Sequence, residues 1–259
     1  MSEIRLDALR SYYDCLFSAW GRQHWWPAQS RFEVIVGAYL TQNTAWTNVE
    51  KALRNVRKAR LLTVRGIRRT SVDELERLIR SAGYFRQKAR RLKIFVSFLD
   101  DRYGGSLTRM FARPTAELRD ELLALNGVGP ETADSILLYA GNHPVFVVDA
   151  YTRRILERHA MIRKAADYEE IRALFEAALG KTSPPPIHHR ERAAGATAPK
   201  GSCHRPSPMS TAQRTALVQV FNDMHGLIVG VGKTHCLKSQ PRCEQCPLQK
   251  FLPEAECRR

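Results

Sequence analysis

The centre of the chain carries the stretch Leu125-Asn126-Gly127-Val128-Gly129-Pro130-Glu131-Thr132-Ala133-Asp134. Its two glycines permit a tight turn, because neither has a Cβ and both can adopt positive φ. Pro130 suits the first turn of a following helix, where free N–H groups can donate to a phosphate oxygen. The stretch therefore predicts two helices joined by a hairpin that grips a phosphate backbone.

The overall charge favours the same kind of partner. The 259 residues include 41 Lys and Arg against 26 Asp and Glu, which gives a formal net charge of +15 and an isoelectric point near 9.9. Basic side chains that neutralise phosphates release counterions, so this excess predicts salt-sensitive binding to a nucleic acid. A solvated basic surface is the alternative explanation.

Neither a membrane span nor a secretory signal is visible in the sequence. No run approaches about 18 apolar residues, and Met1–Arg10 contains acids and lacks an apolar core. The cysteines do not form the pattern of a secreted disulfide scaffold, because Cys15 and Cys203 stand alone while the other four crowd the C-terminal region. We expect a cytoplasmic protein with a metal or cluster site.

Apolar periodicity predicts helices along almost the whole chain, and hence an all-α protein. Helices are expected over 32–40, 48–61, 88–99, 115–125 and 131–140, and Ser71-Val72-Asp73-Glu74 resembles a capping box. Val145–Val148 is the only strand-like run and is too short to build a sheet. Residues 182–210 are rich in Pro, Gly and Ser, which predicts a flexible, exposed insertion.

Several longer strings carry a family resemblance. The hairpin stretch resembles the helix-hairpin-helix (HhH-GPD) DNA glycosylases of the endonuclease III superfamily, most of all their 3-methyladenine glycosylase branch. The other matching strings are Trp25-Trp26-Pro27, Leu40-Thr41-Gln42-Asn43-Thr44, Gly83-Tyr84-Phe85-Arg86-Gln87-Lys88-Ala89 and Val147-Val148-Asp149-Ala150-Tyr151. The resemblance covers roughly residues 20 to 160 and the C-terminal cysteines.

This resemblance implies two helical lobes that flank a DNA cleft. A six-helix barrel over 30–143 would carry the hairpin. Residues 1–29 and 144–259 would form the second domain, with a cysteine loop at 236–257. Asp149 and the hairpin would face each other across the cleft.

Asp149 stands where the family has its essential aspartate, so the resemblance implies a catalytic role. From position alone it is a helix N-cap, and the two roles are compatible. A fixed carboxylate can stabilise the positive charge that develops on deoxyribose as the base leaves, and it can assist water.

The position of Glu131 bears on a second activity. In bifunctional family members a lysine two residues after the second hairpin glycine attacks the sugar, and glutamate cannot form the required imine. We therefore predict a monofunctional DNA N-glycosylase, a hydrolase without efficient strand cleavage.

Chemistry on a base requires the base to leave the duplex and enter a pocket. Trp25, Trp26, Pro27 and Trp46 match pocket residues of the alkyladenine branch, and tryptophan faces suit a cationic base. The alternative is that some of these tryptophans belong to the core. The residues expected to contact DNA are Gln42, which would enter the duplex, and Gly127, Val128, Gly129, Glu131 and Thr132 of the hairpin.

The C-terminal cysteines resemble the iron–sulfur loop of the same superfamily. The spacing Cys236-x6-Cys243-x2-Cys246 matches, but the family's fourth position falls on Leu252, and the available thiol is Cys257. We expect these four cysteines to hold a [4Fe–4S] cluster, with structural zinc as the alternative.

The favoured function is therefore base excision repair of alkylated purines such as 3-methyladenine. The chain would act as a monomer on double-stranded DNA with a flipped damaged base, without a membrane, and in association with the bacterial nucleoid. Two alternatives stay open: an endonuclease III-like glycosylase and lyase for oxidised pyrimidines, uracil or mismatched bases, and a non-catalytic DNA-binding protein.

Overall fold

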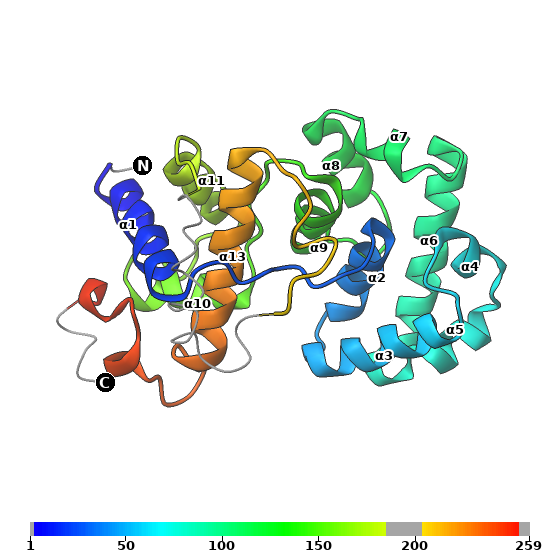
Figure 1. Cartoon of the computed structure of the whole chain (residues 1–259), viewed down its shortest axis with the longest axis horizontal. Coiled ribbons are helices and arrows are strands. Elements are labelled where there is room, and N and C mark those ends of the chain that lie inside the picture. The colour runs from blue at the N-terminus through cyan, green and yellow to red at the C-terminus, as the bar shows by residue number, and fades with distance from the viewer. Residues whose placement is uncertain (1–2, 185–203, 254–259) are drawn as a thin grey trace. The chain divides into compact units, whose positions relative to one another are not determined.

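The computed structural model describes residues 3–184 and 204–253, and every regular element in these ranges is helical (Figure 1). The all-α prediction is therefore confirmed for the described part of the chain. Contacts divide the chain into two compact units. One unit is Ala28–His143, and the other combines Met1–Pro27 with Pro144–Arg259. We call them the hairpin unit and the aspartate unit, and describe each by itself.

The hairpin unit consists of several short helices and one helix of 19 residues. Its elements are α2 (Arg31–Thr41), α3 (Trp46–Lys58), α4 (Val64–Arg69), α5 (Val72–Leu78), the 3-10 turn η1 (Arg80–Ala82), α6 (Phe85–Tyr103), α7 (Leu107–Phe111), α8 (Thr115–Leu123), α9 (Pro130–Ser135) and the π-helical turn η2 (Ile136–Gly141). Every residue from Phe32 to Leu40 is buried, so α2 forms the core of the unit.

Hydroxyl side chains fix where these short helices begin. Ser30, Thr63, Ser71 and Ser106 each accept a backbone N–H from the first turn of the helix that follows. At Ser71 only half of the expected capping box forms. The Ser71 hydroxyl accepts the Glu74 N–H at 3.2 Å, whereas the Glu74 carboxylate binds Arg77 on the helix surface.

The aspartate unit is assembled around one buried helix. Its elements are α1 (Glu3–Trp20), α10 (Ala150–Arg158), α11 (Tyr168–Leu179), α13 (Ala216–Thr234) and the 3-10 turns η4 (Cys243–Gln245) and η5 (Gln249–Phe251). Helix α13 packs against α1, α10 and α11. Its residues from Val220 to Gly232 are all buried, as expected for a helix with neighbours on every side.

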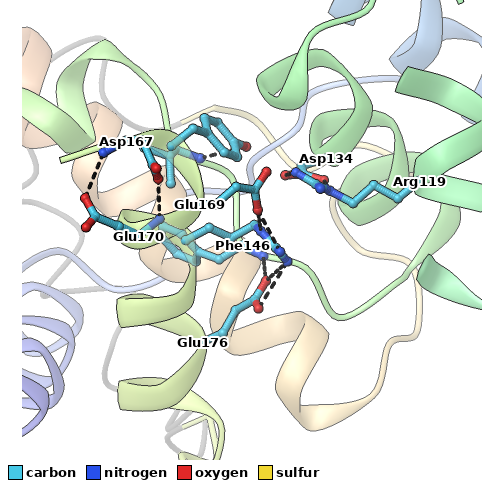
Figure 2. A network of polar contacts seen from close by, with 10 residues as sticks. Arg119, Asp134, Phe146, Asp167, Glu169, Glu170 and Glu176 are labelled. Carbon is cyan, nitrogen blue, oxygen red and sulfur yellow. Dashed lines mark hydrogen bonds and ion pairs between the residues drawn. The ribbon is translucent and has the colours of Figure 1, made fainter. Parts of the chain in front are cut away.

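The strand-like run Val145–Val148 is buried but forms no strand. Side chains of α11 satisfy its backbone instead: Phe146 N–H donates to Glu176 Oε1 at 3.0 Å, and Val148 N–H donates to the Tyr168 hydroxyl at 3.3 Å. Figure 2 shows this network beside the capping box of Asp167 and Glu170 that begins α11. These hydrogen bonds hold the run against α11 just before Asp149.

Part of the predicted insertion 182–210 falls outside the described residues, namely 185–203. Where the chain is described again, His204 N–H donates to the Gln23 carbonyl at 3.1 Å, so this part packs beside the segment that leads to Trp25.

Candidate functional site

The hairpin joins α8 to α9 and depends on glycine at one position above all. Gly127 has φ +80°, and a Cβ placed there would lie 1.9 Å from Arg91 Nε. Gly129 is different, because its φ is −96° and nothing lies within 4 Å of where a Cβ would be. Pro130 opens α9 as expected, with Glu131 exposed in the first turn and Val128 buried beneath the turn.

Three of the residues expected to contact DNA meet in this unit. Gln42 Nε2 donates to the Gly127 carbonyl and to Thr132 Oγ1, both at 2.9 Å, while Gln42 Oε1 accepts from Arg91 Nη1 at 2.8 Å. The side-chain amide of Gln42 therefore connects the loop after α2 to the hairpin.

A buried lysine ties the same loop to the turn before α6. Lys88 Nζ donates to the Leu40 carbonyl at 2.9 Å, the Ala82 carbonyl at 2.8 Å and Thr44 Oγ1 at 2.7 Å. Burial, with a smaller contribution from Arg91, lowers the pKa of Lys88 to about 8. The ammonium group thus meets three acceptors inside the unit.

Sequence reasoning assigned no role to Tyr84, which the structure makes conspicuous. Its side chain is 68% exposed, its φ is +44°, and the neighbouring Gly83 lies beside Thr44. The motif Gly83-Tyr84-Phe85 was visible in the sequence, but exposure of an aromatic next to the Gln42 loop follows only from the fold.

The tryptophans expected to line a pocket divide between the two units. Trp46 begins α3 in the hairpin unit, half-buried, and its Nε1 donates to Glu50 Oε1 at 2.8 Å. Trp25, Trp26 and the half-buried Pro27 belong to the aspartate unit.

Trp25 and Trp26 are packed rather than open, with exposures of 6% and 5%. Their ring centroids lie 5.4 Å apart, and Lys233 Nζ lies 5.4 Å from the centroid of Trp25. Helix α13 approaches this pair closely, because a Cβ at Gly226 would be 3.0 Å from the Cβ of Trp25.

Asp149 is the N-cap of α10 and takes part in a capping box. Its Oδ1 accepts the Thr152 N–H at 2.7 Å and the Thr152 hydroxyl at 2.9 Å. Its Oδ2 lies 3.7 Å from His225 Nε2 on α13. The N-cap interpretation is therefore observed directly, and it leaves one carboxylate oxygen outside the cap.

His225 is a titratable neighbour of that second oxygen, and its side chain is 4% exposed. Burial lowers the pKa of His225 below its ordinary value; the Asp149 carboxylate opposes this shift and Lys233 adds to it. The imidazole is consequently neutral at pH 7.

Three of the four predicted cluster ligands line one pocket. Cys236, Cys243 and Cys246 share it with Arg158, His159 and His235. Arg158 Nη1 donates to Cys236 Sγ at 3.1 Å. Burial raises the pKa of Cys246 to about 11, and the thiols of Cys236, Cys243 and Cys15 contribute in the same direction.

Cys257 lies outside the described residues. Within 3–184 and 204–253 no group of three or more His, Cys, Asp or Glu side chains is arranged to hold a metal ion. The donor set, several thiols around one pocket, nevertheless fits the chemistry of an iron–sulfur or zinc site.

The hairpin and the capped aspartate both lie within the range that a known family matches. The model of the HhH-GPD superfamily of base excision DNA repair proteins matches residues 36–181. The chain belongs to this superfamily. HhH-GPD membership agrees with the resemblance found in the sequence, and the protein is a DNA repair glycosylase.

Individual relatives agree with the HhH-GPD assignment. A chain from Methanocaldococcus jannaschii named for DNA repair glycosylase activity is 38% identical over 97% of this chain and 98% of its own length. The mouse endonuclease III-like protein 1 is 27% identical over 99% of this chain and 72% of its own length.

Solved structures of HhH-GPD proteins have the same fold. The Helicobacter pylori 3-methyladenine DNA glycosylase bound to 1,N6-ethenoadenine has a TM-score of 0.64 and 29% identity, covering 88% of this chain and 95% of that one. A trapped endonuclease III–DNA covalent intermediate has a TM-score of 0.68 and 24% identity, with 98% of both chains covered. Among the helices described here, none is long and apolar enough to cross a membrane.

Proposed function

We propose that this glycosylase hydrolyses the N-glycosidic bond of alkylated purines such as 3-methyladenine. The observation that carries the proposal is the anchored carboxylate of Asp149. Thr152 binds one of its oxygens twice and leaves the other outside the cap. A carboxylate held in this way stabilises positive charge on the sugar without having to reorganise as the base leaves.

The substrate class rests on the aromatic pair and on one relative. Trp25 and Trp26 bring two indole rings within 5.4 Å of each other, and rings of this kind stack on a flipped purine. The Helicobacter pylori relative is named for 3-methyladenine and was solved with a modified adenine. We extend that class of lesion to this chain, with Trp46 and Pro27 as further pocket residues.

Duplex DNA with an extruded base is the proposed partner of a monomeric enzyme. Gly127, Val128 and Gly129, with Glu131 and Thr132 in the first turn of α9, would meet the phosphates. Gln42 and the exposed ring of Tyr84 would occupy the space that the base vacates. We propose that the enzyme acts on chromosomal DNA in the nucleoid.

We propose that strand cleavage is absent, because Glu131 offers no amine at the position where lyases of the superfamily carry one. The second candidate is a bifunctional glycosylase and lyase that uses a different amine as its nucleophile, and one observation favours it. Lys233 lies against Trp25 in the same unit as Asp149. Borohydride trapping of a covalent adduct with DNA would identify this alternative, and replacing Lys233 by Met would then abolish the adduct.

A [4Fe–4S] cluster held by Cys236, Cys243, Cys246 and Cys257 is proposed as a structural cofactor. Arg158 would donate to the Cys236 thiolate, as it donates to Cys236 Sγ here. The cluster would stabilise the end of α13 and would take no part in the hydrolysis. Iron and acid-labile sulfide in the purified protein, with visible absorbance, would support it; stoichiometric zinc without iron would replace it by the zinc alternative.

Measuring the free base released from damaged DNA tests the proposed activity. Duplexes carrying 3-methyladenine, 1,N6-ethenoadenine, uracil, an oxidised pyrimidine or a mismatch would be incubated with enzyme in excess, and free base would be measured. The proposal expects the alkylated purines to be released fastest. Fastest release of uracil or the oxidised pyrimidine would contradict the substrate class and leave the glycosylase assignment intact.

A further inference from the structure

The two oxygens of Asp149 have different surroundings, and the difference is created by two helices. On its own helix α10, Thr152 occupies Oδ1 through its N–H and its hydroxyl. On α13, His225 Nε2 faces Oδ2 at 3.7 Å. This separation is longer than a hydrogen bond, but a shift of about 0.7 Å would form one.

Close contacts on the C-terminal side of His225 hold α13 against α10, the helix that Asp149 caps. A Cβ at Gly232 would lie 2.3 Å from the ring of Tyr151, two residues after Asp149, so this ring rests directly on the helix backbone. Arg154 of α10 donates to the Gly232 carbonyl at 2.9 Å and to the Cys236 carbonyl at 2.7 Å. Helices α10 and α13 therefore cannot easily slide past one another.

The His225 ring itself is enclosed by aromatic side chains. Its centroid lies 6.1 Å from that of Trp25 and 6.3 Å from that of Phe146. Asp149 across the helix interface and Lys233 on its own helix both act on its charge, and the ring of His204 lies 5.2 Å from that of Trp25. The imidazole therefore lies beside the proposed catalytic carboxylate.

We propose that His225 is a positioning residue for Asp149: the neutral imidazole holds Oδ2 in the orientation that faces the sugar, and a proton gained by the imidazole turns the carboxylate into half of an internal ion pair. The inference rests on the catalytic role proposed for Asp149. In the ion pair, the negative charge of Asp149 is compensated by His225 and stabilises the developing positive charge on the sugar less.

The sign of the pH effect follows from the environment of His225. Burial lowers the pKa of His225 below its ordinary value of 6.5, so the imidazole is neutral at pH 7 and gains its proton only as the pH falls below that ordinary value. Base release should decline with this protonation on the acid side. Replacing His225 by glutamine keeps an N–H donor but removes the titration, so the acid decline due to this residue should disappear.

The test is the single-turnover rate of base release from about pH 5 to pH 8, where a histidine changes charge. H225Q should keep a rate near that of the wild type at pH 8 and show no histidine-dependent acid decline. H225A should lose about 10- to 100-fold at every pH, as expected for a misplaced catalytic group. H143Q is the matched control, since His143 is also a buried histidine with a lowered pKa but belongs to the hairpin unit; it should keep the wild-type profile.

The outcomes separate this inference from the proposed function. If H225A and H225Q both reproduce the wild-type rate and profile, His225 has no positioning role even though D149N is inactive. If D149N itself releases base at the wild-type rate, the catalytic role of Asp149 fails first. Should H225A not fold, as judged by circular dichroism, the profile of H225Q decides alone: a retained acid decline overturns the inference, and its loss supports it.

Discussion

The side chain of Arg91 lies directly on the backbone of Gly127, so that a Cβ at this glycine would be 1.9 Å from the guanidinium Nε. Arg91 also donates to Gln42, and Gln42 in turn donates to the Gly127 carbonyl. Residues from the loop after α2, from α6 and from the hairpin thereby form one closed set of contacts. The conformation of the hairpin thus depends on packing from within its own unit.

Replacing Gly127 by alanine should therefore destabilise the protein. The new Cβ must displace Arg91, and the positive φ adds strain, which together cost about 1–3 kcal/mol. Urea unfolding measures this loss. Gly129→Ala is the matched control, because a Cβ there meets nothing within 4 Å; it should change stability by less than about 0.5 kcal/mol. Equal losses in both variants would contradict the packing argument.

Replacing Lys88 by methionine should also lower the free energy of unfolding. Its three hydrogen bonds end on Leu40, Ala82 and Thr44, and their acceptors would be left buried without this donor. Such a loss costs about 3 kcal/mol or more. The exposed Lys51 provides the comparison, and K51M should stay within about 0.5 kcal/mol of the wild type. A wild-type melting temperature for K88M would show that the buried ammonium stabilises nothing.

Asp223 should give stability a pH dependence of unusual sign for a carboxylate. Burial raises its pKa from 3.8 to about 6, although Arg22 and Gln219 act in the opposite direction. Because the folded state holds this proton more tightly than the unfolded state, the contribution is fully present below pH 3.8 and is lost as the pH rises through 6. D223N lacks the titration, so its stability relative to the wild type should increase over this range. A relative stability that falls with rising pH would refute the assignment.

The all-α fold and its helices follow from apolar periodicity, as α2 and α6 illustrate. Helix α2 is an apolar run suited to a fully buried helix, the apolar residues of α6 recur at helical spacing, and both helices form. The capping role of Asp149 was predictable because aspartate before an amphipathic helix is a strong N-cap signal. The family was predictable from the hairpin stretch 125–134, because its two glycines and its proline already specify the turn.

Contacts between distant residues could not be predicted in this way. Nothing in the sequence pairs Asp149 with His225, because their proximity depends on α10 packing across Gly232 of α13. The exposure of Tyr84 and the burial of Lys88 likewise depend on how the turn before α6 meets the loop after α2. The run Val145–Val148 has strand-like composition but finds its partners on α11, so local propensity gave way to tertiary hydrogen bonds.

Lys233 should lower the rate at which cationic damaged bases are released. Its ammonium group lies over the ring of Trp25, the face on which a cationic base would stack. A cation–π contact is worth about 0.5–2 kcal/mol, so K233M should raise the rate for 3-methyladenine relative to neutral 1,N6-ethenoadenine by about 2- to 30-fold. The exposed Lys238 gives the control variant K238M. An unchanged ratio of the two rates in K233M would remove Lys233 from lesion selection.

The central claim is that the Asp149 carboxylate drives release of the base. Its most direct test is the single-turnover release of 3-methyladenine by D149N, with DNA binding and thermal stability measured on the same preparation. Asparagine retains an N-cap oxygen for Thr152, so the variant should fold and bind DNA while base release falls by about 100-fold or more. Release at the wild-type rate by a folded, DNA-binding D149N would contradict the account.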